Sequence, residues 1–208
     1  MNKNTQSVDR KVLSKIYGHK RGWVFTPSHF KDLGSRDAVA SALKRYKQNG
    51  LIRQLARGLY DYPVRHARLG ELAPSVDAVA QALAGREAIR IQPSGAYAAN
   101  RLGLSTQVPM KVVYLTDGIS RTVTVGNQEI VLKRTSPKNM ATAGRISGLV
   151  IQALRYLGKE HVDQKIVDAL DSRLDRAACD QLMQDIRYAP AWIADIIRDL
   201  SERKGTEQ

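Results

Sequence analysis

The sequence predicts an α+β fold in which an N-terminal winged helix-turn-helix is followed by a small mixed α/β layer and a C-terminal helical bundle. Three observations indicate this fold. Residues 35–62 combine an amphipathic helix with two short β-prone runs around a turn that contains glycine. Residues 111–134 hold three more β-prone runs, and residues 143–203 show helical periodicity between short polar links.

The winged fold needs three elements before residue 35, and the sequence offers each of them. Residues 7–17 predict a helix, because apolar side chains recur there at four-residue steps. Residues 23–25 predict the small additional strand of a winged fold. A short second helix is expected over residues 27–33, between an N-cap at Thr26 and a stop at Gly34.

The helix expected between Ser35 and Gly50 has a clear division into two faces. Val39, Leu43 and Tyr46 recur at i, i+4 and i+7 and form one apolar stripe. Ser35 is expected as the N-cap, and Asn49-Gly50 tolerates the left-handed backbone that ends a helix. The opposite face is polar and holds Asp37, Ser41, Lys44 and Gln48, with Arg36 in the first turn and Arg45 and Lys47 beside that face.

A β-hairpin is expected directly after this helix. The β-prone runs 51–55 and 59–62 surround the turn Ala56-Arg57-Gly58. Arg53 and Arg57 are therefore expected at or near the tip of the hairpin. A helix followed by such a hairpin is the second half of a winged helix-turn-helix, which places the helix in a major groove and the wing against the DNA backbone.

The remaining chain is expected to form a second domain, residues 69–208, after a DNA-binding domain of residues 1–68. Residues 64–73 are interpreted as a connector. The strands of the second domain are expected at about 88–135 and its helices at 143–203. The individual elements expected are helices over 75–84 and 96–102, strands over 88–91, 111–116, 122–125 and 129–134, and helices over 145–157, 162–170, 176–188 and 190–203.

The net charge of +13 is concentrated at the N-terminal end of the chain. Residues 1–68 contain 15 Lys and Arg against 4 Asp, a net charge of +11, whereas residues 69–208 contain 18 against 16, a net charge of +2. Because Lys and Arg neutralise phosphates, this asymmetry indicates a polyanion-binding module joined to a nearly neutral one. A solvated basic surface or binding to acidic lipid is the alternative, but no membrane-seeking helix is present in the pattern.

The remaining composition excludes several classes of protein. One cysteine excludes an internal disulfide framework and a cysteine-rich zinc site. The histidines lack ligand spacing, so no metal and no cofactor are expected. No apolar run approaches the roughly 20 residues needed to cross a bilayer, and the polar start lacks a signal-peptide h-region. A cytoplasmic protein without a membrane partner is expected.

The candidate DNA-binding residues lie off the apolar stripe or in basic loops. Arg36, Ser41, Lys44 and Arg45 include side chains suited to guanine edges and phosphates. Thr26, Ser28 and His29 begin the second helix, where backbone amides can meet a phosphate. The full candidate set is Lys20, Arg21, Thr26, Ser28, His29, Arg36, Asp37, Ser41, Lys44, Arg45, Lys47, Arg53 and Arg57. No catalytic residue is expected.

Over residues 7–135 the chain resembles the AbiEi-type antitoxins of abortive-infection, type IV toxin-antitoxin systems. The features that carry the resemblance are GWVFTPSHFKDLGSRDAVASALKRYKQNGLIRQLARGLYDYP, PSGAYAANRLGLS and KVVYLTDG. The resemblance implies a DNA-binding repressor of its own operon that reads double-stranded operator DNA. Helix-turn-helix proteins often dimerise to read inverted repeats, so an operator with inverted repeats is one expectation. It also implies that the segment after the wing opposes a nucleotidyltransferase-like toxin, by contact or indirectly, through residues that the resemblance does not identify.

Two alternative functions are compatible with the pattern. Asp117, Glu129 and Lys133 lie on or beside consecutive strands, like the acidic pair and lysine of a metal-dependent nuclease. The spacing of Glu129 and Lys133 departs from that motif, because on a strand four residues span about 13 Å. The other alternative is a transcriptional regulator whose second domain senses a small molecule.

Overall fold

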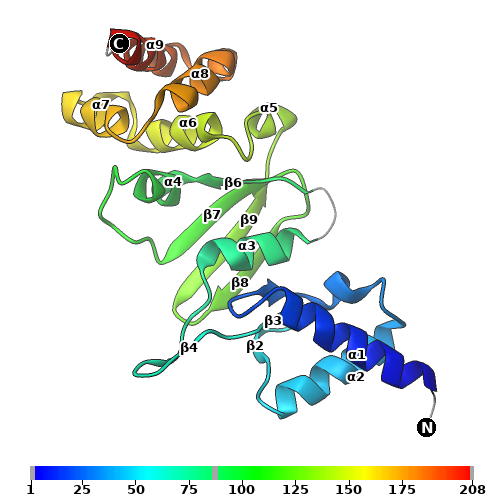
Figure 1. The fold of residues 1–208 in the computed structure, drawn as a ribbon. Coiled ribbons are helices and arrows are strands. Elements are labelled where there is room, and N and C mark those ends of the chain that lie inside the picture. Colours follow the sequence, from blue (N-terminus) through cyan, green and yellow to red (C-terminus); the bar gives the residue numbers. More distant parts are fainter. Residues whose placement is uncertain (1–2, 86–88, 207–208) are drawn as a thin grey trace. The chain divides into compact units, whose positions relative to one another are not determined.

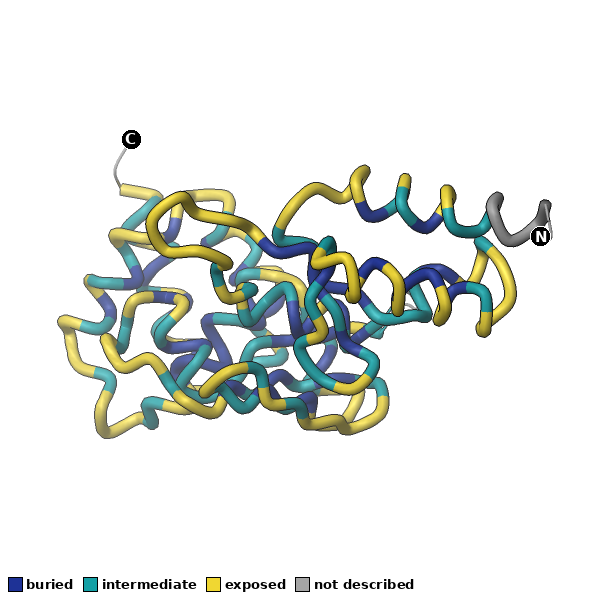
Figure 2. The backbone as a smooth tube through the Cα atoms, turned by 90° about the horizontal axis from the view of Figure 1, so that it is seen from below, coloured by how far each residue is buried: buried dark blue, intermediate teal, exposed yellow. Residues whose placement is uncertain are grey.

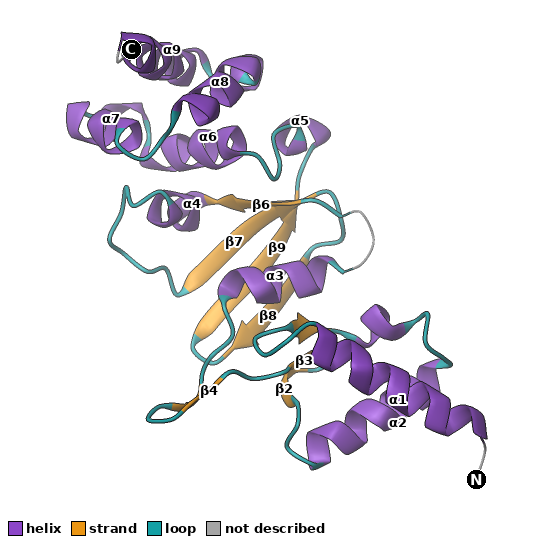
Figure 3. Cartoon of the chain, viewed as in Figure 1, coloured by secondary structure: helices purple, strands orange, loops and turns teal. Residues whose placement is uncertain are grey.

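The computed structural model describes residues 3–85 and 89–206 and shows a mixed α+β chain (Figure 1). The chain divides into two compact units. Unit 1 comprises Met1–Ile89 and Val123–Ile130, and unit 2 comprises Arg90–Thr122 and Val131–Gln208. Both units contain helices and strands (Figure 3). The functional division into domains 1–68 and 69–208 stays a prediction.

Two helices form the framework of unit 1. Helix α1 spans Lys3–Gly18 and helix α2 spans Arg36–Gln48, and the two helices pack side by side. Along both helices, buried and exposed stretches alternate with the helical turn (Figure 2). The apolar side chains of the predicted stripes, with their neighbours, form the core of the unit, which contains Val12, Ile16, Phe25, Phe30, Val39, Ala42, Leu43, Tyr46, Ile52 and Tyr62.

Both ends of α2 are as the sequence predicts. The Ser35 side chain accepts a hydrogen bond from the Ala38 backbone N–H at 3.3 Å, which satisfies one free donor of the first turn. At the other end Gly50 takes a φ of +66°, a conformation that costs glycine little. The helix therefore begins and ends where its local signals place it.

The second helix differs from the prediction. Pro27–Phe30 forms a 3₁₀-helix, η1, and turns follow up to Leu33 instead of a continuous helix over 27–33. The His29 ring folds back and accepts a hydrogen bond from the Thr26 backbone N–H at 3.1 Å. A single tight turn satisfies the few backbone groups available between Pro27 and Gly34.

Gly34 lies where α1 approaches the turn before α2. A Cβ atom built on Gly34 would lie 2.6 Å from Val8 Cγ2, closer than side chains pack. We expect Gly34→Ala to lower the free energy of unfolding by about 1–3 kcal/mol, because overpacking forces helices apart. Urea denaturation would measure the loss, and Val8→Ala in the same chain should recover part of it.

Gly18→Ala is the matched control for this experiment. A Cβ atom on Gly18 meets no heavy atom within 4 Å. Equal destabilisation by both substitutions would contradict the close contact as the cause.

A three-stranded sheet completes the first part of unit 1. It has the order β1-β3-β2, with β1 at Val24–Phe25, β2 at Arg53–Ala56 and β3 at Leu59–Asp61. The predicted hairpin is confirmed, but Arg53 is not near its tip. Arg53 begins β2 and pairs with Asp61, whereas the turn lies at Arg57-Gly58.

Residues 64–73 are not a simple connector as predicted. They contain a second, smaller hairpin with β4 at Arg65–His66 and β5 at Gly70–Glu71. The helix predicted over 75–84 is present as α3, Val76–Ala84, and the Ser75 side chain caps it by accepting a hydrogen bond from the Ala78 backbone N–H at 3.2 Å. Helix α3 packs against β1.

A four-stranded sheet has the order β6-β7-β9-β8. Its elements, with the helix that follows β6, are β6 Ile91–Ser94, α4 Gly95–Arg101, β7 Lys111–Thr116, β8 Arg121–Val125 and β9 Gln128–Arg134. The three strands predicted over 111–134 are confirmed. The strand predicted over 88–91 lies about three residues later, and Ala88 is outside the described residues. Pro93 is tolerated because β6 is an edge strand.

The helices that follow the four-stranded sheet are α5 Pro137–Met140, α6 Ile146–Leu157, η2 Lys159–His161, α7 Gln164–Asp171, α8 Arg176–Gln184, η3 Ile186–Tyr188 and α9 Ala191–Thr206. Helices α6, α7, α8 and α9 share one apolar core with residues of α4. The core contains fully buried Leu154, Leu170, Leu182, Ile193, Ile197 and Leu200. The single cysteine, Cys179, is also buried in it, and this burial raises the pKa of its thiol.

Helix α8 ends earlier than the predicted 176–188. Asp185 follows its last residue and is 2% exposed. The Asp185 carboxylate accepts hydrogen bonds from Arg145 at 2.6 Å and from the Ser147 hydroxyl at 2.5 Å. These hydrogen bonds hold Asp185 against the start of α6, and helix α8 ends just before Asp185.

Within residues 3–85 and 89–206, no helix is long and apolar enough to cross a bilayer.

Candidate nucleic-acid interface

The outward face of α2 is polar and open to solvent. Asp37, Ser41 and Lys44 are exposed, opposite the buried stripe of Val39, Leu43 and Tyr46. Side chains on one face of a helix project together, so these residues form a single contact surface. Among the described residues, Lys44 has no hydrogen-bond or ion-pair partner that would hold it away from a ligand.

Arg45, which the sequence also places at the groove, lies on a different side of α2. Its Nη2 atom is 2.5 Å from Asp9 Oδ1 on α1. The neighbouring Tyr46 hydroxyl donates to the Asp9 carbonyl at 2.9 Å, and burial with the Asp9 contact raises the pKa of Tyr46. Arg45 therefore ties the two helices together instead of extending freely outward.

The C-terminal end of α2 and the β2–β3 hairpin border a hollow of about 570 Å³. We call it the basic hollow, because Lys47, Arg53 and Arg57 line it with one acidic residue, Glu71. Lys47 Nζ donates to Gln54 Oε1 on β2 at 2.7 Å, which links the helix to the hairpin. Arg57 lies in the hairpin turn and is exposed.

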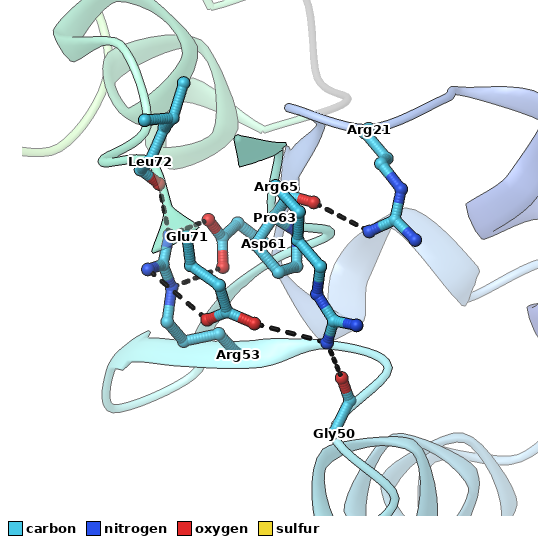
Figure 4. A network of polar contacts seen from close by, with 8 residues as sticks. All are labelled: Arg21, Gly50, Arg53, Asp61, Pro63, Arg65, Glu71 and Leu72. Carbon is cyan, nitrogen blue, oxygen red and sulfur yellow. Dashed lines mark hydrogen bonds and ion pairs between the residues drawn. The ribbon is translucent and has the colours of Figure 1, made fainter. Parts of the chain in front are cut away.

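Arg53 is held in a network at the base of this hairpin (Figure 4). Its Nε and Nη2 atoms donate to the two Asp61 carboxylate oxygens at 3.1 and 2.6 Å, and Nη2 also donates to the Leu72 carbonyl at 2.9 Å. The Asp61 side chain is 1% exposed, and its hydrogen bonds raise the pKa of Arg53. This arginine neutralises a buried carboxylate.

The basic loop between α1 and β1 holds two more predicted residues, Lys20 and Arg21. Lys20 is exposed and has a φ of +64°. Arg21 Nη1 donates to the Pro63 carbonyl at 2.9 Å (Figure 4). Its guanidinium also lies 4.6 Å from the centre of the Tyr62 ring. Arg21 therefore packs on the end of β3, whereas Lys20 extends from the loop.

Thr26, Ser28 and His29 bond mainly to one another. The Thr26 and Ser28 hydroxyl oxygens are 2.7 Å apart, and His29 Nδ1 bonds to the Thr26 backbone. These contacts stabilise η1, so the three side chains are positioned by the turn itself. Ser28 also borders a second hollow of about 410 Å³ together with Arg36 of α2.

The structure therefore brings together only part of the predicted set. Arg36, Asp37, Ser41, Lys44 and Lys47 share α2, and Arg57 joins Lys47 at the basic hollow. Arg21, Arg45 and Arg53 serve internal contacts.

The sequence reasoning missed the small hairpin of residues 65–71. Arg65 Nη2 donates to the Gly50 carbonyl at 2.9 Å, just beyond the end of α2. Arg68 lies in the hairpin turn and is exposed. The sequence signal that could have indicated this hairpin is Gly70, which follows basic residues and takes a φ of +71°, a turn conformation that glycine adopts easily.

Asp117, one of the residues of the nuclease alternative, is engaged in an internal contact. Arg90 Nε lies 2.8 Å from Asp117 Oδ2, and this hydrogen bond lowers the pKa of Asp117. The carboxylate is thus already paired with a cation. In the part of the chain that the structure describes, no group of three or more His, Cys, Asp or Glu residues is arranged to hold a metal ion.

Comparison with known proteins gives one finding. Residues 11–182 match the model of a protein family described as a family of unknown function (DUF6088). The match includes α2, both hairpins, the four-stranded sheet and most of the C-terminal helices. No curated protein matches the chain.

Proposed function

The chain belongs to the DUF6088 family, whose function is unknown, and we propose that it is a transcriptional regulator that binds double-stranded DNA through unit 1. In this proposal α1, η1, α2 and the three-stranded sheet are a winged helix-turn-helix. Helix α2 lies in the major groove, and the β2–β3 hairpin is the wing that contacts the DNA backbone.

The observation that carries the proposal is the division of α2 into two faces. The buried stripe packs the helix onto α1 and the sheet, which leaves Ser41 and Lys44 on the outside. A major groove admits an α-helix, and Lys and Ser side chains can donate to base edges and phosphates there. Asp37, on the same face, can accept from the amino group of cytosine.

The basic hollow supports the same orientation. A helix in the major groove brings its C-terminal end and the wing close to a phosphate backbone. Lys47 and Arg57 line the hollow from the helix and the hairpin. Arg53 balances the charge of Asp61, and Arg65, 3.3 Å from Glu71, balances the charge of Glu71. The hollow therefore keeps a positive charge that suits a phosphodiester.

Salt-dependent binding tests this function. We expect the full chain to bind a fluorescein-labelled duplex of the region upstream of its own gene more tightly than a shuffled duplex. In fluorescence anisotropy the logarithm of the affinity should fall linearly with the logarithm of salt concentration, by about 0.9 for each phosphate neutralised. Equal affinity for both duplexes, or affinity independent of salt, would contradict the proposal.

The resemblance to AbiEi-type antitoxins extends the proposal to autorepression and antitoxin activity. The DNA would then be the chain's own operator, and residues 69–208 would oppose a nucleotidyltransferase-like toxin. Co-expression with the open reading frame beside its gene tests this extension. The full chain and its Lys44→Ala variant should both relieve the toxicity of that frame, since Lys44 is proposed to act only on DNA. A harmless neighbouring frame would favour a regulator without a toxin partner.

A further inference from the structure

The hairpin of residues 65–71 is too short and too exposed to be stable by itself. Each of its strands, β4 and β5, contains two residues, and Arg65, His66, Gly70 and Glu71 are exposed. An isolated two-stranded hairpin is marginally stable in water. Contacts outside the hairpin must therefore hold it in place.

Those contacts connect the hairpin to α2 and to the wing (Figure 4). Arg65 donates to the Gly50 carbonyl at 2.9 Å and contacts Glu71 at 3.3 Å. Arg53, at the base of the wing, lies 3.7 Å from Glu71 and donates to the Leu72 carbonyl. The hairpin is thus fixed beside the basic hollow, which Glu71 also lines.

The tip of the hairpin carries the positive charge of Arg68, which is exposed. Within residues 3–85 and 89–206, the guanidinium of Arg68 has no hydrogen-bond or ion-pair partner. His66 Nδ1 accepts from the backbone N–H groups of Arg68 and Leu69 at 3.2 and 3.3 Å, which shapes the turn and exposes the arginine. Leu69 is 73% exposed beside it.

We propose that this hairpin is a second wing that contacts the same DNA duplex as α2, with Arg68 on the phosphate backbone. This inference rests on the proposed function. Arg65 and Glu71 balance each other, so Arg68 supplies the net charge of the element. A phosphate is the matching ligand for an exposed arginine on a rigid turn, and the apolar Leu69 beside it can pack against the deoxyribose.

The experiment measures binding of the full chain to the upstream duplex by fluorescence anisotropy and by hydroxyl-radical footprinting. Arg68→Ala should weaken binding roughly five- to tenfold and lower the salt slope by about one, because one phosphate contact is lost. It should also remove a protected stretch of backbone next to the stretch protected by α2. Arg134→Ala, which changes an exposed arginine of β9, is the matched control and should bind like the wild type.

Comparing Arg68→Ala with Lys44→Ala distinguishes failure of the second wing from failure of the proposed function. Wild-type affinity, salt slope and footprint in Arg68→Ala, together with weaker binding by Lys44→Ala, would overturn the second wing and leave the function standing. Unaltered binding in both variants, or no binding by the wild-type chain, would overturn both. Unchanged thermal unfolding of Arg68→Ala is expected, since its side chain is exposed and makes no hydrogen bond or ion pair with the described residues.

Discussion

Replacing Lys44 by alanine should lower the affinity of the full chain for the upstream duplex about 5- to 100-fold, as expected for the loss of a contact at a base edge or phosphate. Lys44 lies on the outward face of α2, opposite the stripe that packs into the core. The variant should fold normally, since Lys44 is exposed and has no hydrogen-bond or ion-pair partner among the described residues. Fluorescence anisotropy at two salt concentrations measures both the affinity and the slope.

Lys165→Ala is the matched control for Lys44→Ala. Lys165 is an exposed lysine of helix α7 in unit 2. The two variants remove the same charge, so a purely non-specific effect of net charge would weaken binding equally in both. Weaker binding only in Lys44→Ala would place α2 at the DNA, and Lys44→Arg should retain most of the affinity because it keeps the charge. Equal affinities of all the variants would remove α2 from the interface.

Arg53→Ala should lower the free energy of unfolding by about 3 kcal/mol, because it leaves a buried carboxylate without its cation. Asp61, the carboxylate concerned, is 1% exposed, and Arg53 contacts both of its oxygens. Arg53 also fixes Leu72 and Glu71, so the hairpin of residues 65–71 should loosen as well. Urea denaturation followed by circular dichroism measures the change.

Arg57→Ala provides the comparison for Arg53→Ala. Arg57 is exposed in the turn of the same hairpin, so its loss should change stability by less than about 0.5 kcal/mol. In DNA binding we expect the reverse order, with the larger loss of affinity in Arg57→Ala, because Arg57 is proposed to contact the DNA backbone directly. The double change Arg53→Ala with Asp61→Asn should recover part of the lost stability, because no buried charge then remains unpaired. No recovery would show that packing of the arginine stem, and not the ion pair, provides the stability.

Elements with strong local signals were predicted well from the sequence. Helix α2 has a serine cap, a regular apolar stripe and a glycine stop, and it forms between these signals. Strands β7, β8 and β9 form where predicted, and the Gly126-Asn127 turn joins β8 to β9. Local periodicity and turn residues decide such elements, so tertiary contacts change them little.

Elements that depend on distant contacts were predicted less well. The second hairpin has strands too short to show periodicity, and it is held by Arg53 and Arg65 from outside. Strand β6 begins about three residues late, because its register follows from pairing with β7, in which Ile91 lies opposite Thr116. The turn η1 is 3₁₀ because the His29 side chain closes it.

The same limit applies to the candidate interface. Periodicity predicted that Lys44 and Ser41 are exposed, since exposure follows from the position of the apolar stripe. It did not predict that Arg45 pairs with Asp9, 36 residues away, or that Arg53 pairs with Asp61. Ion pairs between residues that are distant in the sequence cannot be recognised from local sequence patterns. The charge of an arginine or lysine therefore does not tell whether its side chain forms an ion pair within the protein or faces a ligand.

The burial of Cys179 has a practical consequence for labelling this chain. It is the only cysteine, it is 1% exposed, and burial raises the pKa of its thiol, so little reactive thiolate is present. A maleimide dye should therefore leave the native protein unmodified. A single cysteine introduced by Arg57→Cys or Arg68→Cys would then be the one site of attachment, and the fluorescence of a dye there would report how close each hairpin comes to a labelled duplex.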